Sequence, residues 1–303
     1  MFIGVEIGGT KLQIGVGDVD GNPVGDVQRL KVEPAKGAAG IRSQLTDVLP
    51  QTFATLGGRH LIHGLGVGFG GPVDSARGRT ITSHQIGGWG DFALVDWFES
   101  TFGVPTVLGN DSDLAGLAEA KCGAGRGAKT VVYSNIGSGI GGAFVRDGEL
   151  YTGQGIGAAE VGHLRIMPGE SGKPWKTLEE TASGWALDRI ARGLLGDASA
   201  TAADLAHAAR SGNLAAAQAW KQAIELWGVA LANVATLLCP DRVVLGGGVA
   251  LQGDFVLDPL RSVFSRNIFP PFAGRCGLVL AELGETMVVQ GALLLAAGMA
   301  KKS

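Results

Sequence analysis

Two stretches of the chain alternate apolar segments and glycine turns in the same order. Residues 5–24 (VEIGGTKLQIGVGDVDGNPV) and residues 134–151 (SNIGSGIGGAFVRDGELY) both pass from an apolar strand through an Ile-Gly pair into a second short strand and an Asp-Gly turn. This order predicts two similar modules and hence a duplicated domain. Matching positions at one constant offset are Ile7 and Ile136, Gly8 and Gly137, Val16 and Val145, and Asp18 and Asp147.

The remaining pattern alternates predicted strands and helices, which favours an α/β fold with a mixed sheet. Trp220, Ile224, Trp227, Leu231, Val234 and Leu238 recur every three or four residues, which predicts a long helix with one buried face, ended by Pro240. Only residues 167–176 have the composition of a loop. Strands are predicted within residues 60–74, 104–111 and 241–251, and helices within residues 91–103, 112–125 and 285–300.

The glycines at 137, 139 and 142 satisfy the G-x-G-x-x-G spacing of dinucleotide-binding proteins. That motif requires a helix directly after the loop, so that the helix N-terminus faces the pyrophosphate. Here the following residues predict strand, turn and strand, which is a hairpin. The context therefore argues against an NAD-dependent enzyme.

Composition restricts the class of protein further. A chain of 303 residues with 46% hydrophobic residues supplies material for about two domains with buried cores. A net charge of -3 and the absence of a dense basic block argue against a nucleic-acid partner. No apolar run is long enough for a membrane span, and the start lacks a signal peptide pattern, so we expect a cytoplasmic protein. The three scattered cysteines predict neither disulfides nor a thiolate metal site.

The glycine turns are candidates for phosphate binding, because their exposed backbone N–H groups form concave anion sites. Thr10 and Lys11 follow Gly8 and Gly9 and add a hydroxyl group and a cation. This sequence alone is more typical of an ordinary turn. Its pairing with the turn at 137–142 and with a third glycine segment at 246–248 favours phosphate binding. No G-x-x-x-x-G-K-[ST] sequence occurs, which excludes a P-loop enzyme.

An ordered series of motifs covers nearly the whole chain. It resembles the ROK family of sugar kinases, within the actin, Hsp70 and hexokinase superfamily. The motifs are EIGGTK, GFGGPVD, GNDSDLAGLAEAKCGAG, IGSGIGG, GIGAAEVGHLRI, LEETASGWAL and VVLGGGVAL.

The resemblance implies an α/β fold of two similar ribonuclease H-like (actin-like ATPase) domains with a cleft between them. The N-terminal domain, for sugar and phosphate, is expected over residues 1–111 plus 287–303, and the nucleotide-binding domain over residues 112–286. The expected ATP contacts are Gly8, Gly9, Thr10, Lys11, Gly137, Ser138, Gly139, Gly246, Gly247 and Gly248.

Asp111 is the candidate general base. By itself an Asn-Asp pair after a strand is more typical of a helix N-cap or a turn. The resemblance implies instead that Asp111 accepts the proton of the sugar hydroxyl as that oxygen attacks the γ-phosphoryl group, as an aspartate does in protein kinases. Asn110 is expected to bind a neighbouring sugar hydroxyl.

The resemblance also places Glu160, His163 and Glu179 at the sugar, with Glu180 as the alternative to Glu179. Sugars present adjacent hydroxyls that both donate and accept hydrogen bonds, which suits carboxylates and an imidazole. A structural role for the histidine is an equal alternative on the residues alone. Gly71 of the Gly-Pro segment is expected beside the same substrate.

The chain departs from the family pattern at two places. Residues 164–177 contain no cysteine where the family has a zinc motif, so we expect no structural zinc and a sugar loop of different shape or one supported by Trp175. Glu6 replaces the usual aspartate and is the candidate for holding Mg²⁺ through a water molecule. The chain also starts directly at a strand without the helix-turn-helix of ROK repressors, so no DNA-binding role is expected.

The predicted function is therefore phosphoryl transfer from Mg·ATP to a hexose. The 6-hydroxyl of glucose is the first expectation, and mannose, fructose or an N-acetylated hexosamine are the alternatives. A sugar-binding sensor without turnover is the rival from another class. Family members are commonly dimers, so a homodimer is expected from the resemblance.

Overall fold

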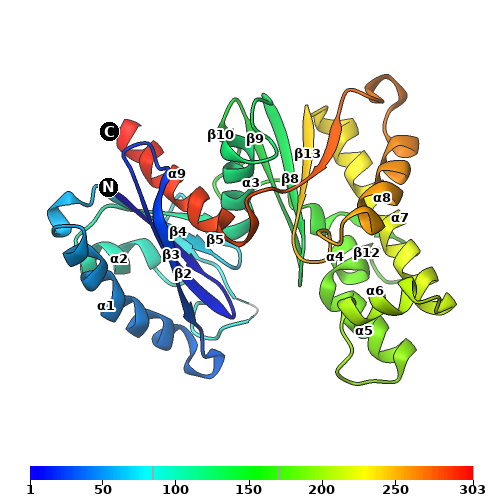
Figure 1. Ribbon diagram of the computed structural model, residues 1–303, viewed down its shortest axis with the longest axis horizontal. Coiled ribbons are helices and arrows are strands. Elements are labelled where there is room, and N and C mark those ends of the chain that lie inside the picture. Colours follow the sequence, from blue (N-terminus) through cyan, green and yellow to red (C-terminus); the bar gives the residue numbers. More distant parts are fainter. Residues whose placement is uncertain (84, 170, 303) are drawn as a thin grey trace. The chain divides into compact units, whose positions relative to one another are not determined.

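The computed structural model describes residues 1–302 except residues 84 and 170, and its chain forms two compact units. The first comprises Met1–Cys122, Glu149–Ala158 and Leu283–Ser303, and the second comprises Gly123–Gly148 and Ala159–Glu282. Each of the two large sheets has five strands, and helices pack on them (Figure 1).

The sheet of the first unit has the order β3-β2-β1-β4-β7. β1 is antiparallel to β2 and parallel to β4, and β4 is parallel to β7. Every residue of β1 and of β4 is buried, as expected for central strands covered on both faces. The bounds are Phe2–Ile7 for β1, Lys11–Gly17 for β2, Pro23–Lys31 for β3, Gly64–Phe69 for β4 and Thr106–Asn110 for β7.

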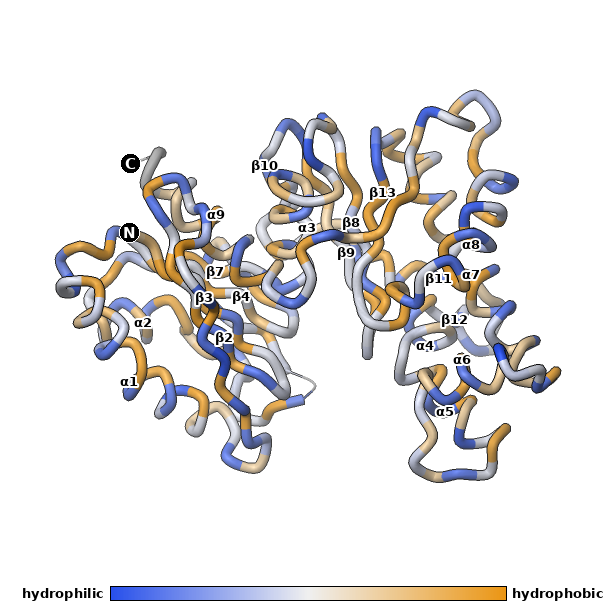
Figure 2. Tube along the Cα trace, viewed as in Figure 1, coloured by the Kyte–Doolittle hydropathy of each residue, from blue (hydrophilic) through white to orange (hydrophobic). Residues whose placement is uncertain are grey.

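Two groups of helices bury the sheet of the first unit. α1 (Gly37–Thr55) and α2 (Leu94–Phe102) contribute apolar side chains to one core, and α9 (Met287–Lys302) packs on β1, β4 and α3 (Asp111–Cys122). Figure 2 shows apolar and polar segments interspersed along α1. Its buried residues recur every three or four positions, which is the pattern of a helix with one buried face: Ala38, Ile41, Leu45, Leu49 and Phe53. α2 ends at Gly103, the last residue of the predicted helical stretch, which adopts the left-handed conformation.

The second unit repeats the strand arrangement. The second large sheet has the order β10-β9-β8-β13-β14, and its strands β8, β9, β13 and β14 belong to the second unit. β8 is antiparallel to β9 and parallel to β13, and β13 is parallel to β14. The predicted duplication is thus matched in topology, and the predicted hairpin at residues 134–151 is confirmed. The bounds are Thr130–Ile136 for β8, Ile140–Arg146 for β9, Glu149–Leu150 for β10, Arg242–Gly246 for β13 and Gly277–Leu280 for β14.

The long helix predicted from the tryptophan stripe is α7 (Leu214–Leu238). Its stripe is buried up to Val234, whereas Leu238 is 40% exposed, because the helix ends there and Cys239 turns into the left-handed conformation. The helices α4 (Leu178–Ala182), α5 (Gly184–Leu195), α6 (Ala202–Arg210) and α8 (Asp254–Asn267) complete the second unit.

The compact units do not divide the chain where the sequence-based domain boundaries do. α3 and residues 149–158 belong to the first unit, although both were assigned to the C-terminal domain over 112–286. α3 belongs to the first unit because it packs along α9, a helix near the C-terminus that also belongs to this unit. The segment 167–176, expected as a loop, is flanked by the short antiparallel strands β11 (Arg165–Met167) and β12 (Lys176–Thr177).

Candidate active site

The first glycine loop is the turn between β1 and β2. The N–H group of Gly8 donates to the carbonyl oxygen of Lys11 at 3.0 Å and closes the turn. A Cβ atom on Gly9 would lie 1.5 Å from Oε1 of Gln85, so the glutamine side chain rests directly on this loop. No sequence pattern indicated this contact, because it joins two segments that are distant in the sequence.

Glu6 and Lys11 form an ion pair beside this loop. Nζ of Lys11 lies 3.5 Å from Oε1 of Glu6 and donates to the carbonyl oxygen of Glu285 at 3.4 Å. Glu6 is only 6% exposed, and this burial raises the pKa of its carboxyl group to about 7. Lys11 opposes the rise, and the negative charges of Asp111 and Glu285 add to it. Lys11, predicted to bind a phosphate group, is thus paired with Glu6, the residue predicted to hold Mg²⁺.

The raised pKa predicts that burial of Glu6 makes stability depend on pH. The folded protein holds the proton more tightly than the unfolded chain, so this contribution to stability is fully present below 4.5, the ordinary pKa of a glutamate side chain, and is lost as the pH rises through about 7. Between pH 5 and pH 8 the unfolding free energy of the wild type should fall by up to about 3 kcal/mol through this group. Glu6→Gln has no carboxyl group to titrate at this position, so its unfolding free energy should lack that fall. Urea unfolding at the two pH values measures the change.

Glu33→Gln is the control for that experiment, since it removes an exposed carboxylate of the same unit whose charge is not among those that shift the pKa of Glu6. Equal differences between Glu6→Gln and wild type at pH 5 and pH 8 would contradict the assignment.

Asn110 and Asp111 lie where β7 passes into α3. Nδ2 of Asn110 donates to the carbonyl oxygen of Gly71 at 2.9 Å, and its Oδ1 accepts from the N–H group of Ser112 at 2.9 Å. Asn110 therefore caps α3 and holds the Gly-Pro segment, which is the structural role that sequence reasoning had considered for Asp111.

The carboxylate of Asp111 is held at the first residue of α3. Its Oδ1 accepts from the N–H group of Ser112 at 2.7 Å. Its Oδ2 lies on the side of Gly70, where a Cβ atom would be 3.5 Å away. The residue is partly exposed rather than covered by the sheet. The structure thus brings Asn110, Asp111 and Gly71 together, as the sequence predicted.

The second glycine loop joins β8 and β9. Gly137 accepts a hydrogen bond from Gly184 at 2.8 Å and Ser138 accepts one from Trp185 at 3.0 Å, so the start of α5 is tied to the loop. Oε2 of Glu179 accepts from the N–H group of Ile140 at 2.8 Å and would lie 2.6 Å from a Cβ atom on Gly139. Glu179, predicted as a sugar ligand, therefore also anchors the predicted phosphate loop.

Glu160 and His163 belong to a short turn over residues 160–164. Glu160 is exposed as a residue, but desolvation of its carboxyl group raises its pKa. The charge of His163 opposes this rise, and the charge of Glu179 adds to it. The charges of His163 and Glu179 thus act on Glu160, so the three residues predicted to bind the sugar lie near one another. Ala159, directly before them, has a φ of 59°, which is unusual for a residue with a Cβ atom.

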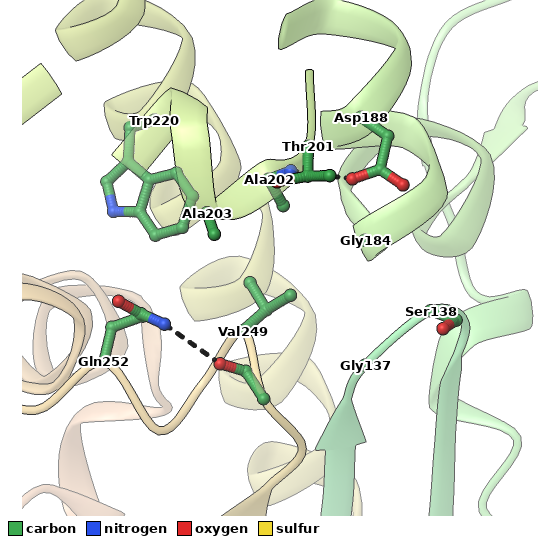
Figure 3. Close-up of a pocket in the computed structure, with 11 residues that line it drawn as sticks. Gly137, Ser138, Gly184, Asp188, Thr201, Ala202, Ala203, Trp220, Val249 and Gln252 are labelled. Carbon is green, nitrogen blue, oxygen red and sulfur yellow. Dashed lines mark hydrogen bonds between the residues drawn. The ribbon is translucent and has the colours of Figure 1, made fainter. Parts of the chain in front are cut away.

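The second unit contains a cavity of about 380 Å³ beside the glycine loop between β8 and β9 (Figure 3). Its size is that of a small-molecule site. Of the third glycine segment, only Gly248 lines it; Gly246 ends β13 and Gly247 forms a turn with a φ of 86°. The lining residues are Gly137, Ser138, Gly184, Asp188, Thr201, Ala202, Ala203, Trp220, Gly248, Val249 and Gln252.

Sequence reasoning missed most of that lining. Oδ1 of Asp188 accepts from the N–H group of Ala202 at 2.7 Å and thereby joins α5 to the start of α6. Trp220 was assigned to the apolar core, and it is indeed buried, but it also forms a wall of the cavity. No short motif links these residues, because they come from three helices and a loop.

Within the described part of the chain, no group of three or more histidine, cysteine, aspartate or glutamate side chains lies close enough together to hold a metal ion. None of the described helices is long and apolar enough to span a membrane.

Trp175, which was considered as a support for the segment that replaces the zinc motif, is 53% exposed.

Comparison with known proteins identifies the family. The model of the ROK family matches residues 2–299. The chain is 30% identical to glucokinases of Halalkalibacterium halodurans, over 96% of this chain and 93% of that protein, and of Streptomyces coelicolor, over 98% and 97%.

Solved structures agree with this match and with the predicted fold class. A ROK hexokinase from Thermus thermophilus superposes with a TM-score of 0.86 at 28% identity, covering 100% of this chain and 99% of that one. A ROK family glucokinase from Streptomyces griseus in complex with glucose and AMPPNP gives 0.79 at 31% identity, covering 98% and 99%. The α/β fold of the actin-like ATPase type is thus confirmed, and the chain belongs to the ROK family.

Proposed function

We propose that the protein transfers the γ-phosphoryl group of Mg·ATP to the 6-hydroxyl of glucose. The chain is a sugar kinase of the ROK family, that is, a phosphotransferase with a hydroxyl acceptor, in agreement with relatives named glucokinase. The observation that carries the proposal is the carboxylate of Asp111, held at the first residue of α3 beside the Gly70–Gly71 segment.

Asp111 is proposed to accept the proton of the attacking hydroxyl group. Phosphoryl transfer requires little covalent chemistry from the protein, so positioning and charge dominate. Asn110 fixes the neighbouring backbone through Gly71 and caps the helix that bears Asp111, so the carboxylate keeps one position. Asn110 retains a second amide hydrogen, which we assign to a sugar hydroxyl.

Glu160, His163 and Glu179 are proposed to bind sugar hydroxyl groups. Glu179 uses Oε2 for the loop at Ile140 and therefore offers Oε1 to a ligand. We propose that Gly137, Ser138 and Gly139 contact the phosphates and that the 380 Å³ cavity receives the nucleoside, since its lining is mainly apolar with a few polar groups.

Glu6 fits a water-mediated contact with Mg²⁺ better than direct coordination, because Lys11 already occupies Oε1. When bound, the metal would neutralise charge on the phosphates. Gly8, Gly9, Thr10 and Lys11 are likewise assigned to the phosphates of ATP. Gly246 and Gly247 are assigned to the nucleotide as the residues that shape the segment before Gly248. A cytoplasmic homodimer belongs to the same proposal, and light scattering of the purified protein tests the dimer.

A coupled ADP-release assay across glucose, mannose, fructose and N-acetylated hexosamines tests the proposal. Glucose should give the highest kcat/KM, and phosphorus NMR of the product should show the ester at the 6-position. Preference for another hexose would overturn only the choice of glucose as the substrate. Sugar binding without ADP release from any hexose would instead indicate a sensor.

A further inference from the structure

A stack of three side chains runs beside the cavity of the second unit. The ring of Trp220, from α7, stacks on the ring of Phe255, from α8, with centroids 5.5 Å apart and an interplanar angle of 23°. The guanidinium carbon of Arg210, at the end of α6, lies 4.3 Å from the centroid of the Phe255 ring. This contact has the geometry of a cation–π interaction. The stack therefore connects three helices and reaches one wall of the cavity through Trp220.

Arg210 reaches a second wall of the same cavity through hydrogen bonds. Its Nη2 donates to the backbone oxygen and to Oε1 of Gln252, both at 3.2 Å. Nε2 of Gln252 in turn donates to the carbonyl oxygen of Gly248 at 3.2 Å (Figure 3). Gln252 and Gly248 both line the cavity, whereas Arg210 is not among its lining residues in the described part of the chain.

The orientation of the Trp220 wall has chemical consequences. Trp220 is 3% exposed, and its Nε1 has no hydrogen-bond partner among the described residues. A buried donor without a partner is costly, so its direction relative to a bound molecule matters. Phe255 restricts that direction by stacking on Trp220, and Arg210 restricts Phe255 through its contact with the Phe255 ring.

We propose that Arg210 is a positioning residue for the nucleotide, acting through Gln252 and Phe255. The proposal rests on the proposed function, which assigns this cavity to the nucleoside of ATP. A planar guanidinium group can stack on a ring and donate two hydrogen bonds at the same time, which an ammonium group does less well. The side chain thereby sets both the Gln252–Gly248 wall and the Trp220 wall of the cavity without touching the ligand.

The test is a comparison of nucleotide and sugar parameters. Arg210→Ala should raise the KM for ATP, and the Kd for AMPPNP of the free protein by calorimetry, about tenfold. The KM for glucose and kcat should stay within about twofold, because the sugar residues and Asp111 are not contacted. Arg210→Lys keeps a cation over Phe255 but not the paired hydrogen bonds, so it should restore only part of the affinity. Arg266→Ala, which breaks the ion pair between Arg266 of α8 and Glu225 of α7, is the control and should leave every parameter near wild type.

A double-mutant cycle distinguishes positioning from general stability. If Arg210 acts partly through Gln252, the variant Arg210→Ala/Gln252→Ala should bind AMPPNP less weakly than the product of the two single effects predicts. Additive effects, or an Arg210→Ala variant with a lower melting temperature and an unchanged KM for ATP, would overturn the inference. Failure of the wild type to bind AMPPNP would overturn the proposed function itself.

Discussion

Asp111→Asn lowers kcat by about a hundred- to ten-thousand-fold in the expected result, with little change in the Kd for glucose. The amide has nearly the same shape but cannot accept the proton of the attacking hydroxyl group. Binding is retained because Asn110 still caps α3 and still holds Gly71. Steady-state ADP release gives kcat, and calorimetry with glucose gives the Kd.

The control for Asp111→Asn is Asp254→Asn, the same change at the first residue of another helix, α8. It removes a carboxylate from a helix N-terminus and should leave kcat near wild type. An Asp111→Asn enzyme that keeps a tenth or more of kcat would contradict the role as proton acceptor. A parallel loss of glucose binding would point to a structural role for the carboxylate.

Gly162→Ala destabilises the fold and weakens sugar binding in the second expected result. A Cβ atom on Gly162 would lie 2.0 Å from the carbonyl oxygen of Ile140, at the start of β9. The backbone of β9 cannot yield as a flexible side chain does, so the turn with Glu160 and His163 must move. Such overpacking costs about 1–3 kcal/mol or more, and we expect a lower melting temperature with a glucose KM raised at least tenfold.

Gly193→Ala is the matched control for that substitution. Gly193 lies inside α5, and nothing is within 4 Å of the position of its Cβ atom. Alanine there should stabilise the helix by about 0.5–1 kcal/mol and leave the KM for glucose unchanged. A Gly162→Ala protein with wild-type melting temperature and kinetics would show that the turn tolerates the displacement.

Much of the site follows from local sequence signals. The hairpins at Gly8 and Gly137 were predicted because strand, glycine turn and strand follow one another within a few residues. The pair Asn110 and Asp111 was placed between a strand and a helix for the same reason. The sequence did not show that Asn110, rather than Asp111, caps the helix, because asparagine and aspartate cap a helix equally well.

Other features depend on contacts between distant segments. The contact of Lys11 with the carbonyl group of Glu285 was missed because the C-terminal segment is distant in the sequence, and its pairing with Glu6 was missed because it depends on the geometry of the hairpin. The raised pKa of Glu6 results from burial, which its sequence neighbours do not reveal. Likewise, α3 joins the first unit because α9 returns to pack on it.

The sequence by itself determined the repeated strand order, the three glycine segments and the carboxylate after β7, because each depends on short-range periodicity and turn chemistry. Only the tertiary structure decided which of these groups line a cavity and with what partners. Trp220, Asp188 and Gln252 meet there from α7, α5 and the loop after β13, and Arg210 joins them from α6. Packing between distant elements creates such a set, and no local pattern in the chain encodes it.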